Sequence, residues 1–148
     1  QVDSGASMSE TTREDEAPKA STSRERGMAK MEEVYGFSYD PATIPGGYVD
    51  VTVDHLFGDI WTRPGLDVRD RRMLAIGVLA AQGMPKLLEI QFGAALEREE
   101  LTEHQVREIV VHLAHYVGWP LSTGANAAAE KVIAARAVSD KTSGTRSE

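Results

Sequence analysis

The segment from Leu101 to Pro120 carries a helix start, a helix stop and apolar residues at helical spacing between them. Thr102 is a good N-cap, and Gln105 three residues later can complete a capping box. Gly118 and Pro120 then end the pattern, as expected where a helix stops. The segment therefore predicts an amphipathic helix with one apolar face, formed by Val106, Ile109, Val110, Leu113 and Val117.

The same periodicity recurs along the rest of the chain, and no stretch alternates as a strand would. We expect further helices at about residues 22–36, 48–61, 67–82, 86–98 and 122–137, with Asp67 as an N-cap. The helix at 48–61 should bury one face, formed by Val49, Val53, Leu56, Phe57 and Ile60. The predicted fold class is all-α, a compact bundle of about six helices. This helical domain spans residues 21–138, between polar tails at 1–20 and 139–148.

Composition excludes several classes of function. The 148 residues contain no cysteine, which removes disulfides, thiolate metal sites and thiol redox chemistry. A net charge of −7 without a basic patch argues against a nucleic-acid partner. No apolar run is long enough for a bilayer, and the first residues lack an apolar signal core. We therefore expect no nucleic-acid or membrane partner and a cytoplasmic location.

The later helices are rich in alanine, as in the stretch "GANAAAEKVIAARA" at 124–137. Such helices bury little apolar area per residue but allow close approach, so a small chain gains from burying more surface against another subunit. This favours a homo-oligomer. The alternative is that alanine fills exposed positions because it is the best helix former.

Glu108, His112 and His115 lie at i, i+4 and i+7, so one helical stripe holds a carboxylate and two imidazoles. His112 is the first candidate for proton transfer, because imidazole titrates near neutral pH. The alternative is a half-buried histidine bonded to Glu108. His115 is either a replacement acid at a shifted position or a polar residue facing water or a neighbouring subunit. The three side chains could in principle bind a metal ion, but the outer pair spans about two turns, so we expect no metal.

Two longer stretches, "FGDIWTRPGLDVRDRRMLAIGVLAAQG" and "AALEREELTEHQVREIVVHLAHYVGWP", closely resemble the γ-carboxymuconolactone decarboxylase family. The stretch "RERGMAKMEEVYG" is similar to that family's first helix. The resemblance implies an alkylhydroperoxidase D-like helical fold and a ring-shaped homo-oligomer, a hexamer or a trimer, with pockets near subunit interfaces. It also implies cofactor-free removal of carbon dioxide from a carboxylated muconolactone in aromatic catabolism.

The chain departs from the family pattern at its reactive positions. The peroxidase branch has a Cys-x-x-Cys pair and then a histidine, where this chain has Met84, Leu87 and Gln91. Thiol peroxidase activity is thus excluded, because the thiolate is its nucleophile. The decarboxylase branch usually has a histidine at the place of Gln91 and another where this chain reads "GFSYD". His112 matches the family, whereas His115 stands where an aliphatic residue is usual.

Cofactor-free decarboxylation needs donors for the developing enolate, an acid, and a clamp for the substrate carboxylate. Arg63, beside the rigid turn at Pro64, is either a clamp or part of a turn-stabilising salt bridge. Arg72 is either a clamp or a solvated surface charge. Gln91 can orient substrate but cannot transfer a proton. Trp61 and Trp119 either wall a pocket for a flat ring or plug helix ends.

Two functional hypotheses follow. The first is a cofactor-free lyase, a decarboxylase acting on a small carboxylated lactone or ring-derived acid. It predicts that Arg63, Gln91 and His112, with His115 as a further member, converge on one closed cavity. The second is a non-catalytic ring-forming scaffold or ligand-binding protein, in which these residues would be scattered.

Overall fold

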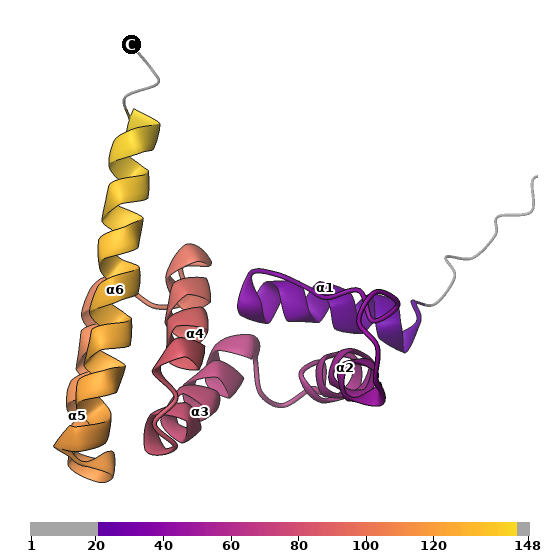
Figure 1. Cartoon of the computed structure of the whole chain (residues 1–148), viewed down its shortest axis with the longest axis horizontal. Coiled ribbons are helices and arrows are strands. Elements are labelled where there is room, and N and C mark those ends of the chain that lie inside the picture. Colours follow the sequence, from indigo (N-terminus) through magenta and orange to yellow (C-terminus); the bar gives the residue numbers. More distant parts are fainter. Residues whose placement is uncertain (1–20, 145–148) are drawn as a thin grey trace, which may run out of the picture.

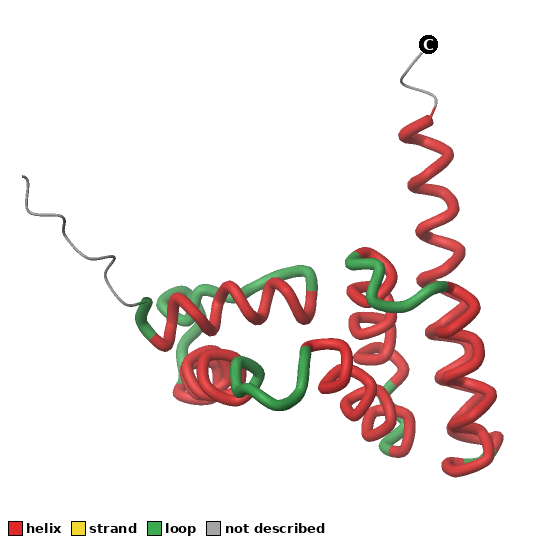
Figure 2. Tube along the Cα trace, turned by 180° about the vertical axis from the view of Figure 1, so that it is seen from behind, coloured by secondary structure: helices red, strands yellow, loops and turns green. Residues whose placement is uncertain are grey.

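The computed structural model describes residues 21–144 of the chain, and every regular element in that range is helical. The predicted all-α class is confirmed. Figures 1 and 2 show α1, α2 and η1 at one end, α4, α5 and α6 at the other, and α3 between them. In chain order the elements are α1 (Ser23–Tyr35), α2 (Gly47–Val51), η1 (Thr52–Ile60), α3 (Val68–Ala81), α4 (Pro85–Glu97), α5 (Glu103–Val117) and α6 (Trp119–Gly144).

The helix starts follow the predicted caps. Thr102 Oγ1 accepts a hydrogen bond from the Gln105 amide at 3.1 Å, and Gln105 Oε1 accepts one from the Thr102 amide at 2.9 Å. The Asp67 carboxylate accepts a bond from the Asp70 amide at 2.8 Å at the start of α3. Thr22 forms a further capping box at the start of α1. Each cap satisfies main-chain donors that the helix itself leaves unpaired.

The segment predicted as one α-helix at 48–61 is mostly a π-helix, η1, after the short α2. Val53 and Phe57 are buried as expected, but Leu56 is 38% exposed, so its predicted place on the buried face is wrong. Turns closed by i→i+5 bonds contain more residues than α-helical turns, so the 3.6-residue spacing no longer assigns faces correctly.

The domain has two hydrophobic cores. The smaller core joins α1 to η1 through Met31, Val34, Val53 and Phe57. The larger core joins α3 to α6 and is formed by Ile76, Ala80, Leu88, Phe92, Ala95, Leu96, Leu101, Val106, Val110, Ala125, Ala128, Ala129 and Ile133. Three alanines of α6, Ala125, Ala128 and Ala129, are buried in this core and allow α6 to pack closely against the bundle. The other four alanines of α6 are exposed, as expected where alanine serves as a helix former.

Two glycines let α1 and η1 touch backbone to backbone. A Cβ at Gly27 would overlap the carbonyl oxygen of Val53, and a Cβ at Gly58 would lie 2.5 Å from the carbonyl oxygen of Ser23. Larger residues at either position would push the two helices apart. This close packing also sets the relative positions of Tyr35 on α1 and Leu56 on η1, which line a pocket.

The last helix is longer than predicted, because α6 begins at Trp119 and ends at Gly144 instead of covering about 122–137. Pro120 sits in its first turn, where the missing N–H breaks no helical hydrogen bond. Residues 139–144, expected to belong to a polar tail, continue the helix as exposed residues beyond the bundle (Figure 1). The expected tail at 1–20 and the last four residues lie outside the described range.

Within residues 21–144, no helix combines the length and the apolar character that crossing a membrane requires.

Candidate active site

A pocket of about 430 Å³ lies between the two cores. We call it the aromatic pocket. It is built by the end of α1 and the following loop, by η1 with Trp61, and by α3 and α4, and none of its lining side chains is charged. The predicted site residues Trp61 and Gln91 both face it. The full lining is Tyr35, Phe37, Tyr39, Leu56, Trp61, Leu74, Ala75, Val78, Leu79, Leu87, Ile90 and Gln91.

One wall of the aromatic pocket is a connected series of rings. Tyr35 packs edge-on against Phe57 at 5.1 Å between centroids, and Phe57 stacks on Trp61 at 6.0 Å. On the other side Tyr35 contacts Phe37 at 5.5 Å, and Phe37 contacts Tyr39 at 5.5 Å. Aromatic pairs in these geometries hold each other in place. The wall is thus tied to the α1–η1 core through Phe57.

Tyr35 is the aromatic residue of this wall with a perturbed titration. Burial raises the pKa of its phenol above the ordinary value of 10.0, and the neighbouring Tyr48 and Tyr39 act in the same direction. The phenol therefore stays protonated at neutral pH and can act as a hydrogen-bond or proton donor.

Gln91 is the polar residue in the lining that is almost completely buried, at 4% exposure. Its Oε1 accepts a hydrogen bond from Arg72 Nη1 at 2.9 Å. Arg72 Nη1 also donates to the Val34 carbonyl at 2.6 Å. The Arg72 Nε and Nη2 atoms donate to the two Glu100 carboxylate oxygens at 2.6 and 3.1 Å. Arg72 thus links the end of α1, the side of α4 and the loop after α4.

The interpretation of Arg72 as a solvated surface charge is wrong, because its side chain is fully buried at 0% exposure. Glu100, 28 residues further along the chain, supplies the counter-charge that burial requires. The Val34 carbonyl lies near the C-terminal end of α1, where carbonyls lack helical partners and a cation is favourable. The guanidinium therefore lies behind Gln91, bound to protein groups.

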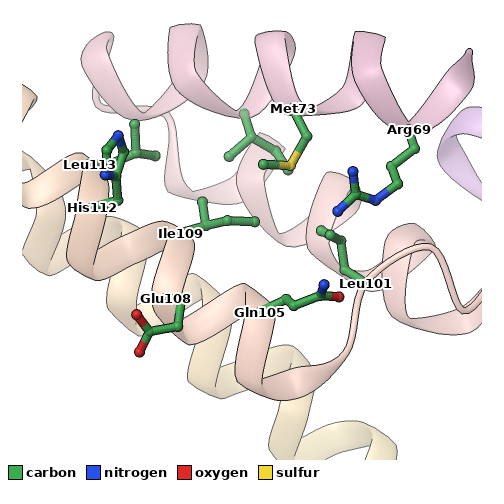
Figure 3. Close-up of a pocket in the computed structure, with 9 residues that line it drawn as sticks. Arg69, Met73, Leu101, Gln105, Glu108, Ile109, His112 and Leu113 are labelled. Carbon is green, nitrogen blue, oxygen red and sulfur yellow. The ribbon is translucent and has the colours of Figure 1, made fainter.

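A second pocket of about 410 Å³ lies between α3 and α5, and we call it the α3–α5 groove. Figure 3 shows Arg69 and Met73 projecting from α3 toward α5, whereas the Glu108 carboxylate points away from α3. Its floor is apolar and its rim carries polar groups. It is lined by Arg69, Met73, Ile76, Leu101, Gln105, Glu108, Ile109, His112 and Leu113.

His112 is exposed, and so is Glu108. The His112 ring packs against Tyr116 at 5.1 Å between centroids. The alternative of a half-buried histidine is therefore wrong: α5 turns this stripe outward, because its buried positions are Val106, Val110 and Ala114.

His115 and Trp119 meet at a notch of about 270 Å³ between α5 and α6. His115 Nδ1 lies 2.8 Å from the Val111 carbonyl oxygen, and the ring meets Trp119 edge-on at 5.5 Å. The Trp119 side chain is 63% exposed, so it does not plug the core as the alternative interpretation expected.

Arg63 lies in a shallow polar depression on the other side of Trp61. Its side chain is exposed, and none of the ion pairs among the described residues involves it, so the expected turn-stabilising salt bridge is not formed. Its carbonyl oxygen accepts a bond from Arg71 Nη2 at 2.9 Å, which ties the turn to α3.

The predicted site residues do not converge on one cavity of a single chain. Gln91 and Trp61 share the aromatic pocket with Arg72 behind it, while His112 and Glu108 face the α3–α5 groove. His115 and Trp119 share the α5–α6 notch. Arg63 and Trp61 line the shallow polar depression, which is outside the aromatic pocket. In the part of the chain that the structure describes, no group of three or more His, Asp or Glu residues gathers to hold a metal ion.

Tyr35 and Tyr39 in the aromatic pocket and Arg69 in the α3–α5 groove were not among the residues predicted from the sequence. Tyr35 follows Met28, Met31 and Val34 at helical spacing, so its position indicated an ordinary core residue. Its place as the last residue of α1, directly before a loop, is the signal that could have suggested a pocket wall.

The model of the carboxymuconolactone decarboxylase family matches residues 47–131. A nitrosuccinic acid decarboxylase of Metarhizium robertsii is 29% identical over 117 residues, which cover 74% of this chain and 80% of that protein. A 4-carboxymuconolactone decarboxylase of Acinetobacter baylyi is 33% identical over 76 residues, which cover 51% of this chain and 56% of that protein. No solved structure matches the chain.

Proposed function

The chain belongs to the carboxymuconolactone decarboxylase family, and from this premise we propose that it is a carboxy-lyase whose active site is the aromatic pocket. One observation carries the proposal. The resembling sequences bear reactive side chains at the places of Met84, Leu87 and Gln91 and in the stretch after the first helix, and all of these places except Met84 contribute to the lining of the aromatic pocket. In this chain Leu87, Gln91, Phe37 and Tyr39 line one cavity, although they come from two distant segments.

The names of the two relatives suggest the class of substrate. One names a lactone acid and the other a nitro acid, and both name decarboxylation. In each acid, a carbonyl or nitro oxygen can accept the electron pair that departing carbon dioxide leaves behind. We propose a small carboxylic acid with such an acceptor group, and we infer no cofactor.

The lining of the aromatic pocket suits this reaction. A carboxylate is poorly solvated among apolar side chains, whereas the charge of the transition state is spread over the acceptor group. The bond between the carboxylate and its neighbouring carbon breaks, carbon dioxide leaves, and the electron pair moves into the acceptor. Tyr35 then gives its phenolic proton to that carbon and recovers one from water. Trp61 stacks against a flat substrate.

The cationic clamp expected for the substrate carboxylate does not lie in the aromatic pocket. The aromatic pocket has no charged lining residue, and Arg63 lies across Trp61 from it. We propose that Arg63 holds a carboxylate that a dicarboxylic substrate keeps, while the departing carboxylate enters the apolar interior. With Arg63 bound to the retained carboxylate, the departing carboxylate has no cationic partner in the aromatic pocket.

A homo-oligomer is part of the same proposal. Leu74 and Val78 on α3 are 63% and 55% exposed, and both border the aromatic pocket. Covering them with a second copy would bury apolar area and shield the pocket from water. The number of subunits follows from the resemblance as a trimer or a hexamer.

The test measures carbon dioxide release from nitrosuccinic acid and from 4-carboxymuconolactone. Val78→Trp should fill the pocket and lower kcat/KM at least about 10-fold. Val138→Trp is the matched control, since Val138 is 65% exposed on α6, far along the chain from the pocket lining. Tyr35→Phe should lower kcat with little change in KM.

The pH profile separates the two candidate acids. Because the pKa of Tyr35 lies above its ordinary value, the phenol stays protonated and turnover should be flat from about pH 6 to pH 9. An imidazole acid would lose activity as pH rises through about 6.5. Such a profile, together with loss of turnover in His112→Ala or His115→Ala and full activity in Val78→Trp, would move the site to α5.

A folded wild-type chain that releases carbon dioxide from neither acid would favour the second function, a ring-forming scaffold or ligand-binding protein. The distribution of the predicted residues over four surface depressions favours that alternative.

A further inference from the structure

The contact between Gln91 and Arg72 determines which way the Gln91 amide faces. A guanidinium group has only donors, so the amide atom 2.9 Å from Arg72 Nη1 must be the oxygen. The amide nitrogen of Gln91 therefore points away from Arg72. The orientation follows from the chemistry of the partner and does not depend on telling nitrogen from oxygen by position.

The Gln91 amide nitrogen is open to the aromatic pocket. The hydrogen bond to Arg72 uses the oxygen, and no other bond of Gln91 is formed among the described residues. Within the same part of the chain, Arg71 Nε is the one side-chain polar atom that is both sealed from solvent and without a partner. Gln91 Nε2 is therefore unpaired but accessible, and Gln91 lines the aromatic pocket.

Hydrogen bonds to Glu100 and to the Val34 carbonyl fix the position of the Arg72 guanidinium and, through it, the orientation of the Gln91 amide. Glu100 engages Nε and Nη2, and Val34 binds the same Nη1 that faces Gln91. The guanidinium cannot turn away without breaking bonds on two other sides. The Arg72–Glu100 pair has no net charge, so the pocket gains a directed donor without a nearby unpaired cation.

We infer that Arg72 is a positioning residue that keeps the N–H donors of Gln91 aimed into the aromatic pocket, and that the pocket selects ligands with a neutral or delocalised hydrogen-bond acceptor there. Nitro and carbonyl oxygens fit this requirement, whereas an ammonium or other donor leaves the amide N–H groups unpaired. This inference rests on the proposed function for the choice of cavity.

Two probes of nearly equal size test the selectivity. 3-Nitropropanoate and 3-aminopropanoate share a three-carbon carboxylate and differ in a nitro acceptor against an ammonium donor. We expect the nitro probe to bind at least about 10-fold more tightly and to shift the Gln91 side-chain amide signals in ¹H–¹⁵N spectra. Gln91→Met removes the donors but keeps the shape, so it should weaken binding of the nitro probe and narrow the preference, leaving only the desolvation cost of the ammonium probe.

The role of Arg72 is tested by removing both charges of its pair. Arg72→Met/Glu100→Met replaces a buried ion pair by apolar side chains of similar volume, a change that folded proteins often tolerate. It should retain a dispersed spectrum and show the same narrowed preference between the probes as Gln91→Met. The matched control is Arg107→Met/Glu130→Met, because that exposed pair between α5 and α6 has the same two-bond geometry at 2.8 and 3.0 Å. It should keep the full preference.

A measurement on the free wild-type chain keeps the inference testable if the double variant does not fold. Nuclear Overhauser contacts of the Gln91 amide protons should reach side chains of the pocket such as Leu87 and not the Arg72 guanidinium. Three results would overturn the inference. They are contacts of the Gln91 amide protons with the Arg72 guanidinium, equal or absent binding of both probes by the wild type, and full preference in a folded double variant. Intact probe selectivity without carbon dioxide release would refute only the proposed enzyme activity.

Discussion

Replacing Arg72 by methionine should destabilise the fold by about 3–5 kcal/mol, because it breaks a buried ion pair and leaves one partner behind. Arg72 is fully buried and the Glu100 side chain is only 15% exposed, so solvent cannot replace the lost guanidinium. The stranded carboxylate is the main cost. We expect this single change to be among the most damaging that a polar residue of the chain can suffer.

The smaller contributions can be counted from the same contacts. Gln91 Oε1 and the Val34 carbonyl each lose a donor, at about 1 kcal/mol each. Methionine fills most of the space of the arginine stem, so the cavity contribution is small. Arg72→Met/Glu100→Met should recover most of the loss, since no buried charge remains unpaired.

Urea unfolding followed by circular dichroism measures these differences. With a slope of about 2 kcal/mol per molar urea, the midpoint of Arg72→Met should fall by about 2 M at unchanged slope. Arg107→Met, on an exposed pair, is the control and should leave the midpoint nearly unchanged. The reasoning is refuted if Arg72→Met loses less than about 1 kcal/mol, or if the double variant is as unstable as the single one.

Three further outcomes follow from local geometry, each read from urea midpoints. Gly27→Ala should cost about 3 kcal/mol, because its Cβ would overlap a main-chain oxygen of η1, whereas Gly77→Ala, with open space around it in α3, should gain up to about 1 kcal/mol. Thr102→Ala should cost about 1 kcal/mol by removing the cap of α5. The hydrogen bond from Arg24 lowers the pKa of Asp54 below 3.8, so the pair stabilises the fold above about pH 4 and is lost as the carboxylate protonates. The gap in midpoint between wild type and Asp54→Asn should therefore narrow as pH falls below 4; a constant gap would contradict this assignment.

Local features were predictable because their causes lie close together in the sequence. The Thr102 capping box and the Asp67 cap join residues three apart, so a short window contains both partners. The start of α6 was misjudged for an equally local reason: a proline ends a preceding helix and also suits the first turn of the next one. Pro120 was assigned the first role and has the second.

The surroundings of Arg72 were not predictable from local pattern. Its burial depends on a carboxylate 28 residues later and on a carbonyl 38 residues earlier, and no periodicity relates these positions. The composition of the aromatic pocket has the same origin, because its walls come from both hydrophobic cores. Gln91 and Trp61, which were separate candidates in the sequence, line this one pocket, whereas the expected partners Arg63 and His112 lie elsewhere.

The exchange of an imidazole for Gln91 changes what this position can contribute to decarboxylation. An imidazole can both bind an oxygen and deliver a proton, whereas an amide can only bind. The oxygen of the amide is bound by Arg72. In the proposed mechanism the amide N–H groups face the charge that accumulates when carbon dioxide leaves, and the proton comes from another group. Tyr35 lines the same pocket, and burial raises the pKa of its phenol further above neutral. In the proposed mechanism the two functions of one imidazole are therefore divided between two neutral side chains. A site of this kind suits a substrate whose acceptor group stabilises negative charge well, such as a nitro group. The carbanion left by loss of carbon dioxide is then long-lived enough to be protonated by a weak acid.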